Sequence, residues 1–359
     1  MKVTSATIAP NNSQAVWTDV IPQLAADHLF VLQGIFAVGS LHLSRSGANE
    51  RDQKLFSNIA AGQLSVGLSQ FRSAIQKPTE QNVEALCAFN TVTTSFMLTS
   101  AAEESKTIIQ LLQKNILTKG QRQKVINDLV HVTSRVFRSF RGVMIFLVPF
   151  WYHLMEGRLA PLLNRAWWPL SVVTTPQAFE EDRILRNLER MWMNSGREYE
   201  IYNDHLKAAL KHLRETFALA SQLTTHAQTT NTTFDWSSVF TWPIASTFDF
   251  IDLIERQQYE AWVIVAHWAV LPSRIENVWW IDLAPNIIAT AAYALDESKW
   301  HLIEWPARVV GVDLENFRVP TTSLPQLGKP LESPVKSSTS QDGTTVVDRG
   351  RLHLSNFGP

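Results

Sequence analysis

Two histidines lie in strongly apolar surroundings, where an imidazole could donate a hydrogen bond or transfer a proton. His42 belongs to the sequence SLHLS and His267 to VAHWAV. A neutral histidine inside a core more often satisfies a local hydrogen bond than performs chemistry. We therefore expect structural roles for both, and keep His42 and His267 as the candidates for a catalytic donor.

The chain contains 13 tryptophans, several of them near its C-terminal end. The stretch from 246 to 311 holds the pairs Trp279-Trp280 and Trp305-Pro306. Tryptophan buries a large area, so such a group either builds an aromatic core or lines an apolar cavity. We expect most of these side chains to be ordinary core. Several could wall a cavity for a sterol- or terpene-like molecule, whose binding needs few polar groups.

Titratable side chains also gather on one expected surface helix. His205 and His212 lie seven residues apart, which places them on one helix face, with Glu198 and Asp204 nearby. They could form a metal site or an acid–base pair, but an exposed face with ordinary charge pairs is the favoured interpretation. Asp282 follows the paired tryptophans and could lie at a pocket mouth, although a surface or capping role is favoured there too.

Common catalytic and cofactor motifs are absent from the sequence. It has no GxGxxG, GxxxxGK[ST], GxSxG or HExxH pattern, which argues against a hydrolase or an oxidoreductase. The single cysteine, Cys87, can form neither an internal disulfide nor a cysteine-rich zinc module. We expect Cys87 to be buried and to act as a small hydrophobic residue. We predict no metal and no cofactor.

The charge balance argues against direct nucleic-acid binding. Lys and Arg number 32 against 33 Asp and Glu, for a net charge of -1, so the excess of positive charge that replaces phosphate counterions is missing. The first residues contain no apolar core of signal-peptide length. The longest apolar run, 142 to 152, is roughly half the ~20 residues of a membrane span. We predict an intracellular protein, cytoplasmic or nuclear, without a transmembrane segment and not secreted.

The elements that would position these residues are helices. Apolar spacing of three and four recurs, and proline and glycine are sparse before residue 310. We expect an interrupted helix or an apolar loop at 146 to 168 and a loop at 229 to 243. The spacing predicts helices at 28–45, 50–76, 80–101, 105–117, 121–141, one or two within 177–228, and 246–270, 277–296 and 299–311.

The predicted organisation is all-α, with a single large helical domain that contains a hydrophobic pocket. A flexible N-terminus is expected at 1–14 and the helical domain at 15–315. From 320 to 359 the sequence is polar, rich in proline and without periodicity, so it cannot bury enough apolar surface to order itself. We expect a disordered tail there.

Two segments give the chain a family resemblance. The first, 15 to 44, reads AVWTDVIPQLAADHLFVLQGIFAVGSLHLS, and the second, 242 to 311, carries "WP", "AHWAVL", "WW" and "WP…VG". Together they resemble the regulatory domain of fungal zinc-binuclear-cluster transcription factors of the sterol-uptake-control type, over about residues 15 to 315. In the first segment the resemblance rests on Trp17, Pro22, Leu24, Ala25, His28, Ala37, Leu41, His42 and Leu43.

The resemblance implies an all-helical domain with an apolar ligand pocket near its C-terminal end. The six-cysteine DNA-binding module of the family is missing here, Gln33 replaces a histidine of its first helix, and Leu283-Ala284-Pro285 replaces a "G-W" after the paired tryptophans. The pocket residues that it implies are Trp262, His267, Trp279, Trp280 and Trp305.

Three interpretations of function follow. The first is a transcription-factor-like protein that binds a hydrophobic sterol-, terpenoid- or polyketide-like metabolite, is linked to secondary metabolism and acts through a protein partner. The second is a cofactor-independent cyclase or isomerase, for example for an intramolecular Diels–Alder-type cycloaddition, in the same type of pocket. His42, His267 and indole N–H groups would be its donors. The third is a truncated gene model that has lost its DNA-binding exon.

Overall fold

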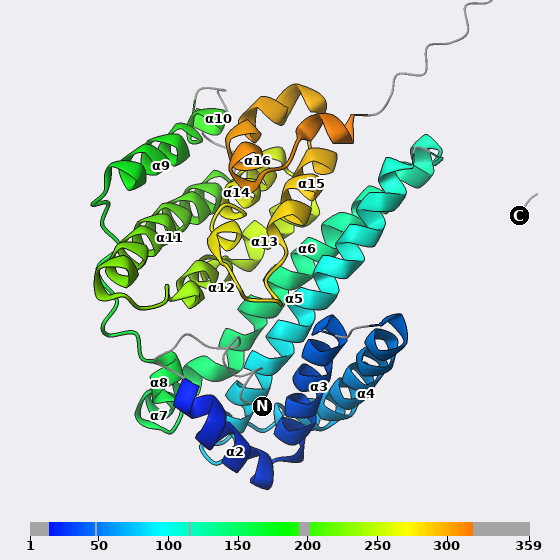
Figure 1. Ribbon diagram of the computed structural model, residues 1–359. Helices are drawn as coiled ribbons and strands as arrows, with labels where there is room; N and C mark the ends of the chain where they lie inside the picture. Colours follow the sequence, from blue (N-terminus) through cyan, green and yellow to red (C-terminus); the bar gives the residue numbers. More distant parts are fainter. Residues whose placement is uncertain (1–13, 47–48, 115, 194–201, 319–359) are drawn as a thin grey trace, which may run out of the picture. The chain divides into compact units, whose positions relative to one another are not determined.

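Helices are the only regular elements in the part of the chain that the computed structural model describes, residues 14–46, 49–114, 116–193 and 202–318. This confirms the all-α prediction. The described residues belong to one compact unit. The predicted tail 320–359 lies outside them, as does the predicted flexible N-terminus up to residue 13. The main helices (Figure 1) are α2 (Ile21–Asp27), α3 (Leu29–Ser46), α4 (Glu50–Ala74), α5 (Val83–Gln113), α6 (Lys119–Leu147), α9 (Pro176–Asn187), α11 (Asn203–Thr230), α13 (Phe248–Glu255), α14 (Tyr259–Trp268), α15 (Ala284–Ala294) and α16 (Glu304–Val310).

Near the N-terminal end, α3 and α4 pack against each other and against the first half of α5. Phe89 of α5 is fully buried where the three helices meet. A Cβ atom at Gly34 of α3 or at Gly67 of α4 would lie 2.9 or 2.8 Å from the Phe89 ring. Glycine at these two positions therefore lets both helices approach the same aromatic ring. We call the buried side chains of this region the N-terminal core.

The long helix α5 belongs to two hydrophobic cores. Its first half, including Phe89 and Val92, is part of the N-terminal core. Its second half, including Leu98 and Leu112, packs into a larger core with α6, α11, α13, α14 and α15, which we call the C-terminal core. The predicted break between helices at 101 and 105 was wrong, because the sequence AAEES at that point holds no helix-breaking residue.

Helix α6 begins at a capping box that the sequence encodes. The Thr118 side chain accepts a hydrogen bond from the backbone N–H of Gln121, whose side chain accepts one from the backbone N–H of Thr118. Together these bonds satisfy two N–H groups that have no partner within the helix. The helix then runs antiparallel to α5 and extends to Leu147, beyond the predicted end at 141.

The C-terminal core surrounds α14, in which every residue from Glu260 to Trp268 is buried. The prediction of one helix over 246–270 was wrong, because a turn with Gln257 in the left-handed region (φ 55°) separates α13 from α14. The predicted helix at 277–296 starts later, at α15, where Pro285 occupies the first turn. Gly311 (φ 80°) ends α16, as expected for a helix C-cap.

The stretch that follows α6 forms an interrupted helix. An interrupted helix was one of the two structures predicted for 146 to 168. A 3-10 turn, η3 (Val148–Phe150), leads into the short helices α7 (Trp151–Glu156) and α8 (Ala160–Leu163). Pro149 and Pro161 lie in the first turns of η3 and α8, where their missing N–H costs no helical hydrogen bond. This stretch brings Trp151, Leu162 and Leu163 next to α5 and α6, where they line a common cavity.

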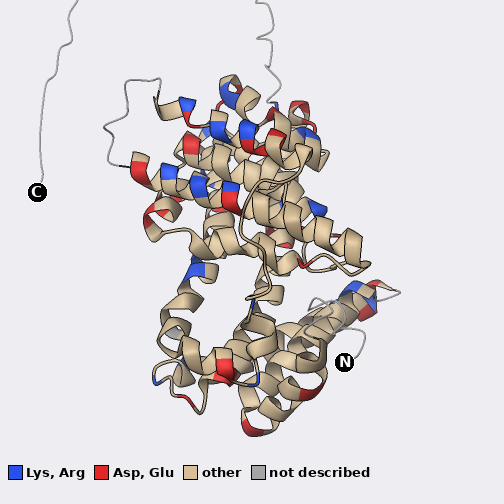
Figure 2. Cartoon of the chain, turned by 90° about the vertical axis from the view of Figure 1, so that its left-hand side faces the viewer, with Lys and Arg blue, Asp and Glu red and all other residues tan. Residues whose placement is uncertain are grey.

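On the face drawn in Figure 2, Lys and Arg lie among Asp and Glu. None of the helices within the described ranges is both long and apolar enough to cross a bilayer.

Candidate functional site

An apolar cavity of about 330 Å³ lies where the N-terminal and C-terminal cores meet along α5. Its size falls within the range of small-molecule sites, about 300–1,000 Å³. Most of its wall consists of aliphatic and aromatic side chains. These are Trp17, Leu98, Phe140, Val143, Met144, Leu147, Trp151, Leu162, Leu163, Trp236, Phe240, Ile244 and Trp280.

A second hollow is larger but has a different character. It measures about 810 Å³ and lies among η6 (Glu297–Leu302), α16 and η7 (Leu314–Phe317). Its lining consists mostly of exposed residues of both charges, such as Glu304 and Arg308. Such an open surface excludes little water from a ligand, so the apolar cavity is the stronger candidate for a binding site.

Helix α5 contributes a polar strip to the cavity, made of Asn90, Thr91, Thr94 and Ser95. The hydroxyl of Thr91 donates to the carbonyl of Cys87 (3.0 Å) and that of Thr94 to the carbonyl of Asn90 (2.9 Å). Their oxygen atoms keep lone pairs that can accept a hydrogen bond. The side-chain amide of Asn90 has no partner among the described residues, so it can both donate and accept.

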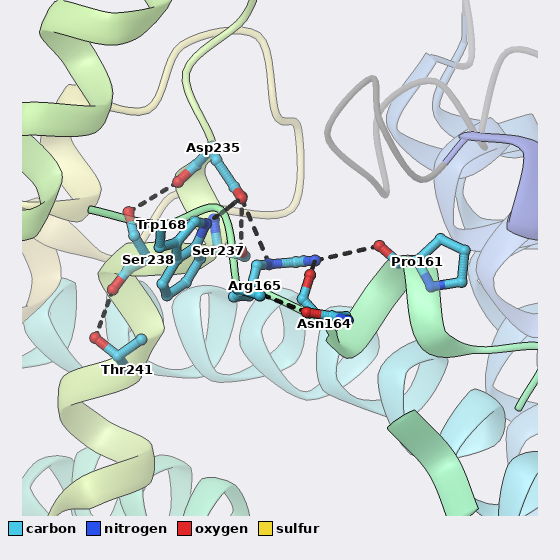
Figure 3. Close-up of polar contacts among 9 residues, drawn as sticks. Pro161, Asn164, Arg165, Trp168, Asp235, Ser237, Ser238 and Thr241 are labelled. Atoms are coloured by element: carbon cyan, nitrogen blue, oxygen red, sulfur yellow. Dashed lines mark hydrogen bonds and ion pairs between the residues drawn. The ribbon is translucent and has the colours of Figure 1, made fainter. Parts of the chain in front are cut away.

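One charged side chain, Arg165, lies in the cavity wall. Figure 3 shows it between Asp235 and the carbonyl of Pro161. Its Nε lies 3.5 Å from Asp235 Oδ2, and its Nη1 donates to Pro161 at 3.2 Å. Asp235 also accepts hydrogen bonds from the Trp168 indole (3.0 Å) and the Ser237 hydroxyl (2.6 Å). Burial lowers the pKa of the Arg165 guanidinium, and the charge of Asp235 partly offsets that effect.

Two further cavity residues have distinctive chemistry. Trp17 is buried, and its indole Nε1 has no hydrogen-bond partner within the described part of the chain. Cys87 is buried as predicted, and burial, helped by the charge of Glu84, raises the pKa of its thiol to about 12. The thiol therefore stays protonated at neutral pH and acts as a small apolar group.

Of the five residues that the family resemblance implied, Trp280 lines the cavity. It is buried, makes an edge contact with Trp236 at 5.1 Å between ring centroids, and stacks on Phe240 at 6.3 Å. Trp279, its neighbour in sequence, turns elsewhere and stacks on the imidazole of His42, with the ring planes 2° apart.

The other three implied pocket residues belong to the C-terminal core instead. The fully buried Trp262 donates its indole N–H to the carbonyl of Ile254 at 3.0 Å. His267 lies 2.8 Å from the carbonyl of Val263 and stacks on Trp305. The structure therefore places Trp262, His267 and Trp305 in a packed region and does not bring them to the cavity.

The two histidines proposed as catalytic donors are neutral in their surroundings. Burial lowers the pKa of His267 to about 4, although its hydrogen bond to Val263 opposes the shift. Because the carbonyl of Val263 can only accept, Nδ1 of His267 carries the proton. Burial also lowers the pKa of His42. Neither side chain lines the apolar cavity.

The polar cluster near His205 forms separate pairs. His205 lies 3.9 Å from Asp249, and His212 lies 3.1 Å from Glu215, each partly exposed. Glu198 lies outside the described residues. Within the described residues no three His, Cys, Asp or Glu side chains are grouped to hold a metal ion. Asp282 is exposed and is not part of the cavity wall.

Sequence reasoning missed Arg165, Asp235 and the polar strip. The strip had a detectable signal, because Asn90, Thr91, Thr94 and Ser95 recur at helical spacing within a mostly apolar stretch. Arg165 and Asp235 are 70 residues apart, and nothing in their local sequences connects them.

Comparison of the chain with protein-family models, with curated proteins and with solved structures found no match. The resemblance to a sterol-sensing regulatory domain therefore stays a prediction.

Proposed function

We propose that this protein binds a hydrophobic small molecule of the sterol, terpenoid or polyketide type in the cavity along α5. The observation that carries the proposal is a cavity of about 330 Å³ whose wall is mostly apolar and holds a few well-placed polar groups. Packed protein interiors leave few voids larger than a water molecule, so a hollow of this size needs an explanation. A ligand that fills it is the simplest one.

Burial alone can supply the affinity. Each 100 Å² of apolar ligand surface removed from water contributes roughly 2.5 kcal/mol. Association costs at least about 4 kcal/mol in lost freedom of motion. A ligand must therefore bury more than about 160 Å² of apolar surface before binding becomes favourable. Terpenoid and steroid skeletons exceed this area comfortably.

A cavity-filling substitution tests the proposal. Thr94→Phe places an aromatic ring into the cavity wall, whereas Thr107→Phe changes the same residue type on an exposed face of the same helix. The two threonines are matched, since each hydroxyl donates to the carbonyl four residues earlier. Ergosterol, farnesol and retinol are added to the full chain, and thermal unfolding is followed.

We expect at least one of these molecules to raise the melting temperature of the parent protein and of Thr107→Phe, but not that of Thr94→Phe. Ligands stabilise the state that binds them, so the shift reports binding directly. The proposal is contradicted if none of the three stabilises the parent, or if Thr94→Phe responds as the parent does.

Catalysis of cyclisation or isomerisation is a second candidate, favoured by the guanidinium of Arg165 in the cavity wall. A fixed N–H donor beside an apolar substrate can orient and polarise a carbonyl or hydroxyl oxygen of that substrate by a hydrogen bond. Gene deletion separates such an enzyme from a ligand-binding regulator of gene expression. Accumulation of one uncyclised intermediate, with transcripts of neighbouring biosynthetic genes unchanged, would support the enzyme. Loss of those transcripts would support the regulator.

A further inference from the structure

The guanidinium of Arg165 has hydrogen-bonding capacity that the protein does not use. Arginine carries five N–H donors. Here Nε faces Asp235 at 3.5 Å, and Nη1 donates to the carbonyls of Pro161 (3.2 Å) and Asn164 (3.5 Å). Nη2 has no acceptor among the described residues. Arg165 lines the apolar cavity, and a lining residue that keeps an unused donor is suited to bind an acceptor atom of the ligand.

Asp235 already balances the charge of Arg165. Its carboxylate is 6% exposed, and it is held in place independently of Arg165 by the Trp168 indole and by the backbone N–H and hydroxyl of Ser237. The pair therefore has no net charge. An anionic ligand would add an uncompensated negative charge beside a buried carboxylate, which a medium of low dielectric constant penalises.

We infer that the ligand is electrically neutral and carries an oxygen acceptor, such as a hydroxyl or a carbonyl, that binds Arg165. The rest of the molecule is mostly hydrocarbon, because apolar side chains form most of the remaining wall beside the polar strip of α5. This inference rests on the proposed function and adds to it the chemical class of the ligand. It predicts that neutral alcohols, aldehydes and ketones bind more tightly than carboxylic acids with the same carbon skeleton.

One carbon skeleton with four end groups tests the inference. Farnesene, farnesol, farnesal and farnesoic acid are titrated into the full chain by calorimetry at a pH at which the acid is ionised. We expect farnesol and farnesal to bind about tenfold more tightly than farnesene, because a hydrogen bond to a charged donor is worth at least that much. We expect farnesoic acid to bind about tenfold more weakly than farnesol.

Two substitutions test whether Arg165 and Asp235 cause these differences in affinity. Arg165→Met keeps an unbranched apolar stem but removes the donors, and should bring farnesol down to the affinity of farnesene. Asp235→Asn removes the balancing charge, and should strengthen farnesoic acid relative to farnesol. Arg183→Met, at an exposed pair with Glu180, is the matched control and should leave all four affinities unchanged. If Arg165→Met does not fold because the buried Asp235 is left without its partner, the double variant Arg165→Met/Asp235→Asn removes both charges and serves in its place.

The outcomes distinguish a failure of the neutral-acceptor inference from a failure of the proposed binding function. Tightest binding of farnesoic acid by the parent, or equal binding of all four compounds, overturns the neutral-acceptor inference and leaves hydrophobic binding intact. The same holds if Arg165→Met, or Arg165→Met/Asp235→Asn in its place, retains the preference for farnesol over farnesene. Failure of all four compounds to bind, the hydrocarbon included, counts against the proposed function itself.

Discussion

The imidazole of His42 lies flat on the indole of Trp279, with ring centroids 4.9 Å apart and planes within 2° of parallel. His42 comes from α3, and Trp279 lies in the segment before α15, so the pair joins distant parts of the sequence. Trp279 also packs partly against both hydrophobic cores. The pair therefore couples the N-terminal core to the C-terminal core.

The first prediction concerns the strength of this stack. A double-mutant cycle of His42→Ala and Trp279→Ala, measured by urea unfolding, should give a coupling energy of about 0.5–1.5 kcal/mol. His42→Phe should keep most of it, because a flat ring is retained. His301→Ala, at an exposed position, should show no coupling to Trp279→Ala. A coupling energy of zero for His42 would mean that the stack contributes nothing to stability.

The second prediction concerns pH. The pKa of His267 is about 4 in the folded protein, below its ordinary value of 6.5. The unfolded chain therefore takes up a proton before the folded one does, and this contribution to stability is present above pH 6.5 and lost as the pH falls toward 4. At pH 5 the loss relative to pH 8 should be roughly 2 kcal/mol.

His267→Gln should remove this part of the pH dependence, and a substitution at the exposed His301 should not. The measurement is the free energy of unfolding in urea at several pH values between 8 and 5. A parallel decline in the parent and in His267→Gln would contradict the assignment.

The third prediction compares glycines on the same helices. Gly34→Ala and Gly67→Ala should each lower the free energy of unfolding by about 1–3 kcal/mol, because the new methyl group collides with Phe89. Gly39→Ala on α3 and Gly62→Ala on α4 meet open space, and should raise stability by about 0.5–1 kcal/mol through helix propensity. Chemical denaturation of the four variants measures whether the free energy of unfolding falls or rises as predicted. Stabilisation at Gly67 would refute the close approach.

The fourth prediction uses the single cysteine. Because burial raises the pKa of the Cys87 thiol to about 12, we expect it to react with a disulfide reagent at least about 100-fold more slowly in the folded protein than in guanidinium chloride. Cys87→Ser should give no signal in either state. Rapid labelling of the folded protein would show that the cavity wall opens readily.

The sequence predicted the helical architecture well, because apolar spacing and cap residues act locally. The end of α16 at Gly311 is an example. The prediction failed at the turn around Gln257, where local backbone hydrogen bonds end α13 with a non-glycine residue in the left-handed region, a position that glycine usually marks in a sequence. The tryptophan-rich stretch could be recognised as buried, but the division between core, in Trp262, and cavity wall, in Trp280, depends on tertiary packing and could not be predicted.

The position of the cavity on α5 has a consequence for how this protein can diversify. The polar strip from Asn90 to Ser95 lies between the half of the helix that belongs to one core and the half that belongs to the other. Substitutions within fewer than about two helical turns can therefore reshape the cavity while both cores keep their own packing. New ligand preferences can arise here with little loss of fold stability, which makes this strip the natural target for selection and for engineering.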